Sequence, residues 1–451
     1  MSELFETGLS DATSMIRSGE ISPVELMESL LSRSASLESK LHVWVTLDEQ
    51  TALNEAKRRQ EDLTSNHLLG PLHGVPVGVK DIFYTKGIKT TACSPLRADF
   101  VPSFDAAAVE RLKRAGAIMM GKTVTTEWAF ADPPPTRNPW DETCTPGGSS
   151  SGSAVGTAAR IFPAALGTQT AGSVLRPASF NGVVGMKPTL GRISRYGVMP
   201  FAWSLDTVGL FVRSVRDAAL LLSVLAGHDP RDGSSPRASA ANYQEAITAE
   251  KTPRIGIVQP QFHAKADPEV WSQFQDVIRK ASEAGSRVDE LSLSTDFESL
   301  LTAHRLIMSV EVAAVHEKEF AATPHKFGTK LRALLETGVS VSALSYNQAQ
   351  QKRKRFRQEA VKTIRGYDVL IAPTANTPAP QDLTTTGDPS FQAPWTSCGF
   401  PSLSLPSGLT NAGMPLGIQL ISAPFAEHRL LETALWLEEV LGVSLEPPPP
   451  V

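Results

Sequence analysis

Residues 145–154 read Thr-Pro-Gly-Gly-Ser-Ser-Ser-Gly-Ser-Ala, and residues 167–177 read Gly-Thr-Gln-Thr-Ala-Gly-Ser-Val-Leu-Arg-Pro. Ser149 lies in the first segment and Ser173 in the second, and small residues surround both. Glycine lets a backbone turn sharply and approach another group closely. A serine in such a turn is a candidate nucleophile, provided that a neighbouring base takes its proton.

Lys80, in Gly-Val-Pro-Val-Gly-Val-Lys-Asp (74–81), is the candidate base. A lysine accepts a proton only when it is neutral, so its pKa must fall from about 10.4 toward about 7. Burial among apolar side chains lowers the pKa in this direction, and the valines before Lys80 supply an apolar strand. Asp81 follows directly, but adjacent strand residues point to opposite faces, so it need not pair with Lys80. A salt-bridged strand end is the structural alternative for this lysine.

The turn Thr170-Ala171-Gly172-Ser173 suits a second task. An amide oxygen becomes negatively charged during attack, and preorganised backbone N–H groups stabilise that charge. Glycine tolerates the backbone conformations that bring several N–H groups to one point. The sequence therefore predicts an oxyanion hole at residues 170–173, with a tight turn before a helix as the alternative.

Two other interpretations of the same region stay open from the pattern alone. Gly148-Ser149-Ser150-Ser151-Gly152 fits the Gly-x-Ser-x-Gly turn of α/β-hydrolases, with Ser150 as nucleophile, and needs a later acid and histidine. Residues 147–156 also suit a phosphate site at a helix N-terminus. They lack the Gly-Lys-Ser/Thr ending of a P-loop, and the Gly-x-Gly-x-x-Gly spacing is not kept.

Lys80, Ser149 and Ser173 stand in a longer set of segments that resembles the amidase signature family, whose members cleave C–N amide bonds. The matching segments, in the family's order, are residues 146–154, 176–189, 191–197, 204–209, 367–374, 399–406 and 413–420. The resemblance implies an α/β fold, with one large α/β/α domain over residues 1–451 and a central mixed β-sheet covered by helices. Within it we expect a catalytic core (60–215), a divergent, mostly helical substrate-side section (230–345) and a mobile Pro-rich tail (446–451).

The resemblance also assigns roles to single residues. Ser173 resembles the nucleophile that forms the acyl-enzyme, and Lys80 resembles the terminal base. Ser149 resembles the bridging serine, which in the family follows a cis peptide bond, here with Gly148. The implied relay takes the proton of Ser173 through Ser149 to Lys80 and later returns it to the leaving amine. The backbone amides of residues 170–173 resemble the oxyanion hole.

Some positions depart from the family's pattern. Many members have aspartate and two glycines where this chain has Gln169, Ala171 and Gly172. Arg176 stands three residues after the nucleophile, as in the malonamidase-like branch, where the arginine can face a substrate carboxylate. The expected substrate contacts are therefore Arg176, Gly148 and two aromatic residues that suit either an apolar pocket or the core, Trp128 and Phe130.

Composition is that of an ordinary globular chain: 451 residues, 41% hydrophobic, 20% charged and a formal net charge of −4. Near-neutral charge gives no case for binding nucleic acid or a membrane surface. The basic run at residues 352–357 is interpreted as a solvated helix face. We expect no metal and no cofactor, because Cys93, Cys144 and Cys398 are far apart and lack metal-ligand spacing. A cytoplasmic protein without a signal peptide or membrane span fits these features.

Local signals predict several elements. Ser22-Pro23-Val24-Glu25 opens a helix through about Leu31, and Asp105 caps a helix from Ala106 to Ala115. Strands are expected at residues 118–120, 255–258 and near Val288, with helices after Ser214 and after Asp267. Residues 298–365 are expected to be mostly helical, and the turn-rich residues 229–235 mark a boundary.

The leading hypothesis is an amidase that hydrolyses a small-molecule amide, with carbamates and aryl amides as further substrates. The alternative is a glutaminase-type A subunit of a tRNA-dependent amidotransferase, although the departures at Gln169 and Arg176 weigh against it. A non-catalytic binding protein on the same fold does not need all three of Lys80, Ser149 and Ser173. A homodimer remains open from the sequence.

Overall fold

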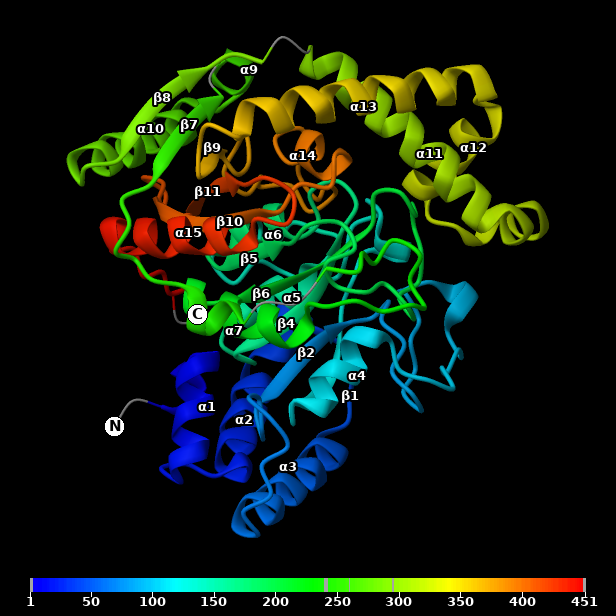
Figure 1. The fold of residues 1–451 in the computed structure, drawn as a ribbon. Helices are drawn as coiled ribbons and strands as arrows, with labels where there is room; N and C mark the ends of the chain where they lie inside the picture. Colours follow the sequence, from blue (N-terminus) through cyan, green and yellow to red (C-terminus); the bar gives the residue numbers. More distant parts are fainter. Residues whose placement is uncertain (1–2, 239–241, 259, 294–295, 449–451) are drawn as a thin grey trace.

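The computed structural model describes residues 3–238, 242–258, 260–293 and 296–448. The strands within these ranges are β1 (Trp44–Leu47), β2 (Pro76–Lys80), β3 (Ile118–Thr123), β4 (Ala164–Gln169), β5 (Val184–Lys187), β6 (Thr207–Val212), β7 (Arg254–Val258), β8 (Arg287–Leu291), β9 (Val369–Pro373), β10 (Ser402–Leu409) and β11 (Pro415–Ile421). They form one 11-stranded mixed sheet in the order β1-β3-β2-β4-β6-β5-β10-β11-β9-β7-β8 (Figure 1).

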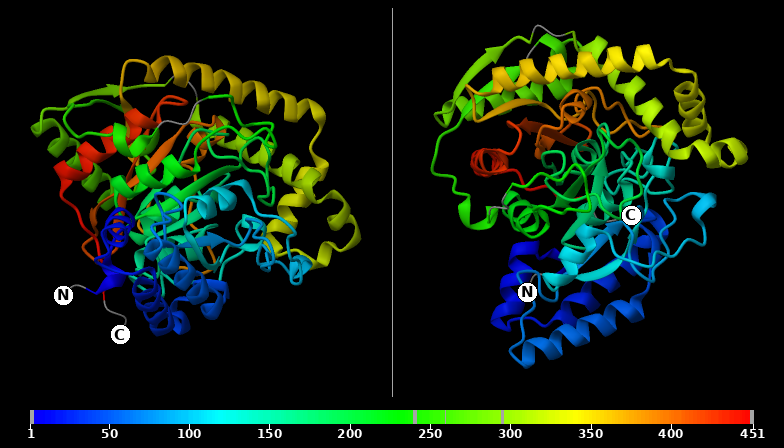
Figure 2. Two further views of the ribbon diagram at one scale, coloured as in Figure 1. Left: turned by 60° about the horizontal axis from the view of Figure 1, so that its bottom comes forward. Right: turned by 45° about the vertical axis from the view of Figure 1, so that its right-hand side comes forward.

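Helices flank this sheet, as the two turned views also show (Figure 2). The described α-helices are α1 (Leu9–Ser18), α2 (Pro23–Leu41), α3 (Glu49–Thr64), α4 (Ala107–Arg114), α5 (Ser151–Ala158), α6 (Leu175–Asn181), α7 (Val215–Leu225), α8 (Tyr243–Ala246), α9 (Pro260–His263), α10 (Pro268–Glu283), α11 (Phe297–Ala322), α12 (Thr329–Ser340), α13 (Ala343–Ile364), α14 (Ala393–Ser397) and α15 (Glu427–Leu441). Short 3₁₀ helices lie at Leu4–Glu6, Pro95–Arg97, Glu127–Ala129 and Pro324–Lys326. The expected single α/β domain with a helix-covered mixed sheet is confirmed.

The centre of the sheet places the candidate catalytic segments together. Strand β2 pairs in parallel with both β3 and β4, and all residues of β2 and β4 are buried. Strands buried on both faces are expected to be continuously apolar, as β2 is apart from its last residue, Lys80. Because the carboxyl ends of parallel strands meet at one edge, Lys80 and the turn after β4 lie at the same edge of the sheet.

Of the two predicted helix caps, the one whose two partners are close in sequence is present. Ser22 and Glu25 form the predicted capping box, although α2 continues ten residues beyond the predicted end, to Leu41. The predicted cap at Asp105 is wrong: Ala106 precedes α4 without a side-chain cap. The Asp105 carboxylate instead accepts hydrogen bonds from the Lys86 backbone N–H and from Lys113 Nζ, which occupy it.

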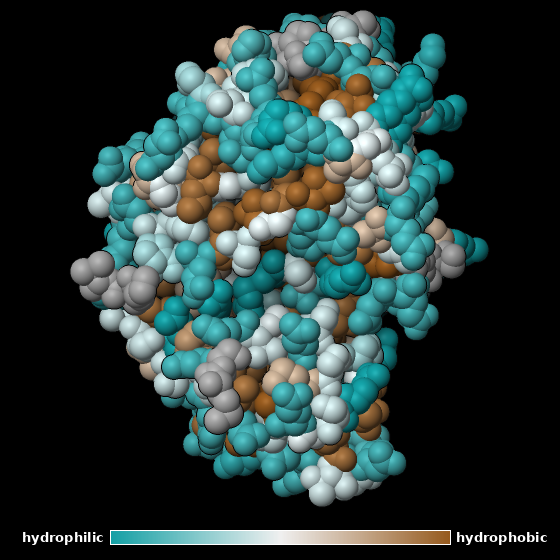
Figure 3. Space-filling view, turned by 90° about the vertical axis from the view of Figure 1, so that its left-hand side faces the viewer, coloured by the Kyte–Doolittle hydropathy of each residue, from teal (hydrophilic) through white to brown (hydrophobic). Residues whose placement is uncertain are grey.

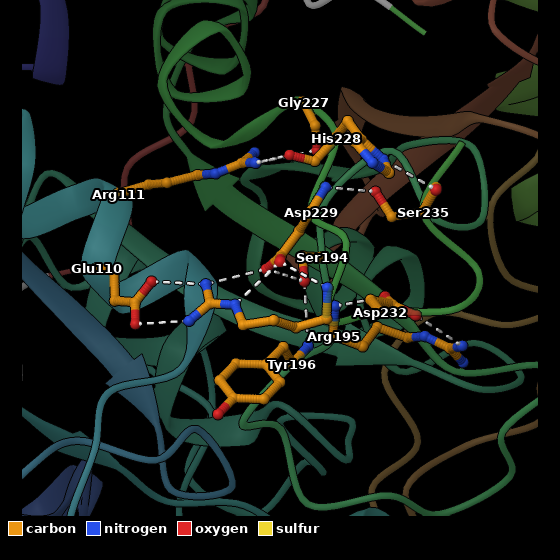
Figure 4. Close-up of polar contacts among 11 residues, drawn as sticks. Glu110, Arg111, Ser194, Arg195, Tyr196, Gly227, His228, Asp229, Asp232 and Ser235 are labelled. Atoms are coloured by element: carbon orange, nitrogen blue, oxygen red, sulfur yellow. Dashed lines mark hydrogen bonds and ion pairs between the residues drawn. The ribbon is translucent and has the colours of Figure 1, made fainter. Parts of the chain in front are cut away.

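The turn-rich residues 229–235 are tied to the core (Figure 4). Asp229 accepts a hydrogen bond from Ser194 Oγ at 2.8 Å and forms an ion pair with Arg231 at 2.9 Å. Arg231 also pairs with Glu110 of α4 at 2.7 Å and lies over the ring of Tyr196. This segment therefore packs against α4 and against the segment that contains Ser194 and Tyr196.

The helical prediction for residues 298–365 is confirmed by α11, α12 and α13. The basic run lies on α13, but Arg353 does not belong to a solvated face. Its guanidinium donates to the backbone carbonyls of Ser397 and Ser204 and fixes α13 to the domain. Of the expected tail, residues 449–451 lie outside the described residues.

Polar residues dominate the face shown in Figure 3, with apolar side chains visible between them. None of the described helices is long and apolar enough to cross a membrane.

Candidate active site

Lys80 is completely buried at the end of β2. Its Nζ donates to Ser149 Oγ at 2.8 Å and to Thr168 Oγ1 at 2.9 Å. Burial lowers the pKa of Lys80 to about 7, against the smaller opposing effects of Asp206 and Cys93. Its hydrogen-bonding partners are hydroxyl groups, so the ion-paired alternative does not describe this lysine.

The neighbouring Asp81 pairs elsewhere. Its carboxylate lies 3.2 Å from Lys122 Nζ, on β3, and accepts from the backbone N–H and hydroxyl of Thr91. The alternation of side chains along a strand explains the separation, as expected from the sequence. Asp81 therefore leaves Lys80 without a carboxylate partner that would hold it protonated.

Ser149 follows a cis peptide bond with Gly148 and is 1% exposed. A Cβ added at Gly148 would lie 2.8 Å from the Thr386 methyl group, so the position has room only for glycine. Directly after it, Ser150 is buried, and its hydroxyl exchanges hydrogen bonds with the backbone of Thr168. This arrangement holds Ser150 within the core and does not support its role as an exposed nucleophile.

Gln169 holds the turn after β4. Its Oε1 accepts from the backbone N–H groups of Val174 and Leu175 at 2.8 and 3.0 Å. Its Nε2 donates to Thr396 Oγ1 at 2.8 Å, and this hydroxyl in turn donates to the Ala171 carbonyl at 2.7 Å. The amide of Gln169 thus performs the anchoring that a carboxylate performs only in part, because a carboxylate has no N–H to donate.

The described residues offer no acceptor to the backbone N–H groups of Ala171, Gly172 and Ser173. A Cβ added at Gly172 would lie 2.4 Å from Gln392 Oε1, so a larger residue there would have to displace the Gln392 side chain. On the other side, Thr170 Oγ1 donates to Asp206 at 2.6 Å. The turn is therefore fixed at both ends while its N–H groups remain free for a ligand.

Ser173 and Arg176 open onto a cavity of about 760 Å³. The lining also contains Thr170 and Ala171, so the candidate nucleophile and the candidate oxyanion hole line the same cavity. Ser173 is 8% exposed, and no hydrogen bond joins it to Ser149 within the described residues. Catalytic hydrogen bonds are often long in the absence of substrate, so the geometry remains compatible with a relay between them.

Arg176 is buried against the cis peptide. Its Nη2 donates to the Gly148 carbonyl at 2.8 Å and to Thr386 Oγ1 at 3.2 Å, whereas Nε and Nη1 have no partner among the described residues. Burial lowers the pKa of Arg176 to about 10, and nearby Asp388 opposes the shift. The guanidinium is therefore still charged at pH 7, and two of its donor nitrogens are buried without a partner among the described residues.

Of the other three expected substrate contacts, only Phe130 is among the described residues that line the cavity. Phe130 lines the cavity and stacks on Phe201 with ring centroids 5.5 Å apart. Trp128 is not among the lining residues: it is 5% exposed, its ring meets the edge of His316, and the prediction of substrate contact is not supported. Gly148 likewise does not line the cavity but supplies the carbonyl that orients Arg176.

Sequence reasoning missed three residues around the site. Thr168 is a second hydroxyl on Lys80, and Asp206 holds Thr170; both lay within quoted segments but received no role. Gln392, far along the chain, packs against Gly172, and no sequence signal pointed to it. Within the described residues, no group of three or more His, Cys, Asp or Glu side chains is placed to hold a metal ion.

Comparisons with known proteins identify the family and similar folds. The family model described as Amidase matches residues 25–431. The chain is 34% identical to the A subunit of a glutamyl-tRNA(Gln) amidotransferase of Geobacter metallireducens, over 97% of this chain and 98% of that protein. It is also 34% identical to a putative amidase, AmiD, of Mycobacterium bovis, over 98% and 95%. The solved structure of the peptide amidase from Stenotrophomonas maltophilia superposes with a TM-score of 0.86 at 29% identity, covering 98% of each chain.

Proposed function

The chain belongs to the amidase family and is an enzyme that hydrolyses C–N amide bonds, and from that premise we propose that Ser173 is its nucleophile. In the proposed reaction, Ser149 takes the Ser173 proton while passing its own to Lys80. The Ser173 oxygen bonds to the amide carbon, and the backbone N–H groups of residues 171–173 receive the oxyanion. Collapse breaks the C–N bond as the proton returns to the leaving amine, and water then hydrolyses the acyl-enzyme by the same relay.

The observation that carries this proposal is the environment of Lys80. A buried lysine with a pKa of about 7, 2.8 Å from Ser149 Oγ, is a neutral base in a large fraction of molecules at pH 7. A lysine at its ordinary pKa would be protonated almost completely and would be unable to accept a proton. The geometry therefore supplies the base that a serine nucleophile needs.

Fluorophosphonate labelling tests the relay. We expect an adduct on Ser173, mapped by mass spectrometry, that forms far more slowly in Lys80→Ala and not at all in Ser173→Ala. An adduct on Ser150, or full turnover by Ser173→Ala, would contradict the proposal.

The substrate is a small molecule whose acyl part carries a carboxylate, because Arg176, a buried charge with two unpaired donor nitrogens, is among the residues that line the cavity. A carboxylate pairs well with such a guanidinium. Arg176→Ala should raise KM for malonamate-type amides by at least about tenfold, but change KM little for the matching uncharged amides. An unchanged KM for malonamates in this variant would exclude the assignment. Carbamates and aryl amides pass through the same tetrahedral intermediate and belong in the same substrate screen.

A second candidate function is a glutaminase subunit, favoured by the similarity to amidotransferase A subunits. In that case the chain would work with protein partners in an RNA-handling complex. Co-purification of a partner subunit or tRNA with the tagged chain would support it. Activity of the isolated chain, as a monomer or homodimer in the cytoplasm, is the outcome that the amidase proposal expects.

A further inference from the structure

Asp206 connects the oxyanion turn to another part of the cavity wall. Its Oδ1 accepts from Thr170 Oγ1 at 2.6 Å, and its Oδ2 accepts from the backbone N–H groups of Phe201 and Ala202 at 2.8 and 2.9 Å. Thr170 and Phe201 both line the cavity onto which Ser173 opens. One carboxylate therefore fixes two parts of this cavity relative to each other.

A second cavity, of about 210 Å³, places Asp206 near the relay. Asp206 and Thr168 both line it, and among the described residues it shares no lining residue with the cavity of Ser173. Thr168 Oγ1 accepts a hydrogen bond from Lys80 Nζ at 2.9 Å, and Asp206 directly precedes β6, which pairs with the strand of Thr168. Within the described residues Asp206 and Lys80 form no ion pair, so the carboxylate acts on Lys80 through its charge at a distance.

The surroundings of Asp206 favour an ionised carboxylate. Burial raises the pKa of Asp206, whereas its hydrogen bonds and the positive charge of Arg195 lower it. Two of these hydrogen bonds come from backbone N–H groups, which can only donate, so a proton on Oδ2 would break them. The side chain is only half-buried and lines a cavity, so it keeps contact with solvent. We therefore expect Asp206 to be charged at pH 7.

The other ionisable groups around Lys80 do not supply a negative charge. Cys93 lies near it, but burial raises the pKa of this thiol to about 12, so the thiol is uncharged at pH 7. The carboxylate of Asp81 is paired with Lys122 at 3.2 Å, and the two charges offset each other. Burial lowers the pKa of Lys80, and among the described residues the charge of Asp206 limits how far it falls.

We propose that Asp206 is a positioning residue with two tasks: its carboxylate holds the oxyanion turn at Thr170, and its charge keeps Lys80 basic enough to take the proton of Ser149. A general base works best when its proton affinity matches the working pH, because a base that loses its proton too easily is neutral but a poor acceptor. This inference rests on the proposed function, since it needs Lys80 as the terminal base.

The test compares the pH dependence of kcat/KM in two variants, with one uncharged p-nitroanilide as substrate. Asp206→Asn removes the charge, so the midpoint of the rise in kcat/KM should move to lower pH by at least about half a unit. Its plateau should fall about tenfold, because the oxyanion turn also loses support. Thr170→Val removes one hydrogen bond but keeps the carboxylate, so kcat should fall while the midpoint stays at the wild-type value. The midpoint does not depend on the fraction of active enzyme, so partial unfolding of a variant does not shift it.

Asp232→Asn is the matched control. Asp232 lines the same second cavity, but its carboxylate accepts from the backbone N–H groups of Arg195 and Ser234 and is not among the groups that act on Lys80. We expect the wild-type midpoint in this variant. Asp206→Glu keeps the charge and should also keep the midpoint, even if the longer side chain lowers kcat. An unshifted midpoint in Asp206→Asn, or an equal shift in Asp232→Asn, would overturn the assignment of Asp206.

The wild type separates this outcome from failure of the proposed function. If its kcat/KM does not rise through about pH 7, Lys80 is not the base, and both proposals are wrong. If it rises but Asp206→Asn has the same midpoint, only the assignment of Asp206 is wrong. Where turnover by a variant is too slow to measure, the pH dependence of fluorophosphonate labelling of Ser173 gives the same midpoint.

Discussion

Lys80 and Lys122 lie on adjacent strands and are both buried, yet only Lys122 has a carboxylate partner. Asp81 lies 3.2 Å from Lys122 Nζ, and Lys122 also donates to the Phe83 carbonyl and Thr90 Oγ1. Among the described residues, Lys80 Nζ donates to two hydroxyl groups and to no carboxylate. Lys122 therefore neutralises the Asp81 carboxylate. Lys80 has no such partner, so it can lose its proton more easily.

This arrangement predicts the pH dependence of the reaction. Since Lys80 must be neutral to accept a proton and its pKa is about 7, kcat/KM should rise with pH through about 7 and then level off. The measurement is kcat/KM for one uncharged amide between about pH 5 and pH 9. A rate that falls as pH rises through 7 would show that a protonated lysine is required.

Gln169 provides a second test at the residue scale. Gln169→Leu removes both the acceptor for Val174 and Leu175 and the donor to Thr396, so the oxyanion turn loses its anchor. We expect kcat to fall by about 10²-fold, comparable to the loss of an oxyanion donor, with a smaller change in KM. Gln169→Glu keeps the acceptor oxygen and should retain more activity than Gln169→Leu. Equal kcat values in the two variants would argue against an anchoring role.

The sequence predicted the segments of the site better than the side-chain contacts within it. The position of Lys80 on a buried strand followed from the valines around it. Trp128 could not be placed in this way, because whether an aromatic ring faces a cavity or His316 depends on how α11 packs. Gln392 approaches Gly172 only in the folded chain, so no local pattern signalled it.

At the scale of helices and strands, a prediction succeeded when both partners were local. The capping box of Ser22 and Glu25 is made within four residues and formed as expected. Asp105 has the right residue type for a cap, but Lys86 and Lys113 compete for its carboxylate. Tertiary hydrogen bonds thus override a local signal of modest energy.

Asp132 shows the reverse case, a helix cap supplied by a distant segment. Its carboxylate accepts from the backbone N–H groups of Lys330 and Leu331, both at 3.0 Å, in the first turn of α12. Asp132→Ala should lower the free energy of unfolding by about 1 kcal/mol, the usual cost of a lost cap. Because Lys330 and Leu334 of α12 line the cavity, KM should rise as well. Urea unfolding and KM are the measurements, and Asp132→Asn, which keeps an acceptor oxygen, is the control.

The cap at Asp132 could also stabilise α12 without affecting substrate binding, and stability and KM would then respond differently. If Asp132→Ala lost stability but kept the KM of the wild type, α12 would hold its position by packing alone. An unchanged stability would show that water replaces the carboxylate at this helix end.

At the scale of the whole molecule, the two ends of the chain share one sheet. Strand β10 pairs with β5, and α15 packs against α7, so segments more than two hundred residues apart are neighbours. Composition and local pattern do not determine this order of strands, whereas the resemblance spread along the whole chain predicted that both ends belong to one domain. The cavity wall from α11 and α12 lies where that resemblance was weakest, which is why its residues could not be named beforehand.

The domain also buries a second lysine that the proposed relay does not use. Lys187 is fully buried, and its Nζ donates to the carbonyls of Pro188 and Phe400. Burial lowers its pKa from 10.5 to about 7, against the opposing charge of Glu427. Above pH 7, Lys187 is therefore mostly neutral in the folded chain, whereas it is still protonated in the unfolded chain.

Stability must then rise with pH between about 7 and 9, because the unfolded state binds more protons in this window. For Lys187 alone the gain over these two pH units is about 2 kcal/mol. Lys187→Met should flatten the dependence by that amount, whatever its constant cost in lost hydrogen bonds, since only the slope reports the proton. Above about pH 9 the buried thiol of Cys398, whose pKa is raised to about 12 by burial, acts in the opposite direction and limits the window. The measurement is the urea midpoint of wild type and variant at pH 7, 8 and 9; parallel curves would show that Lys187 stays charged in the folded protein.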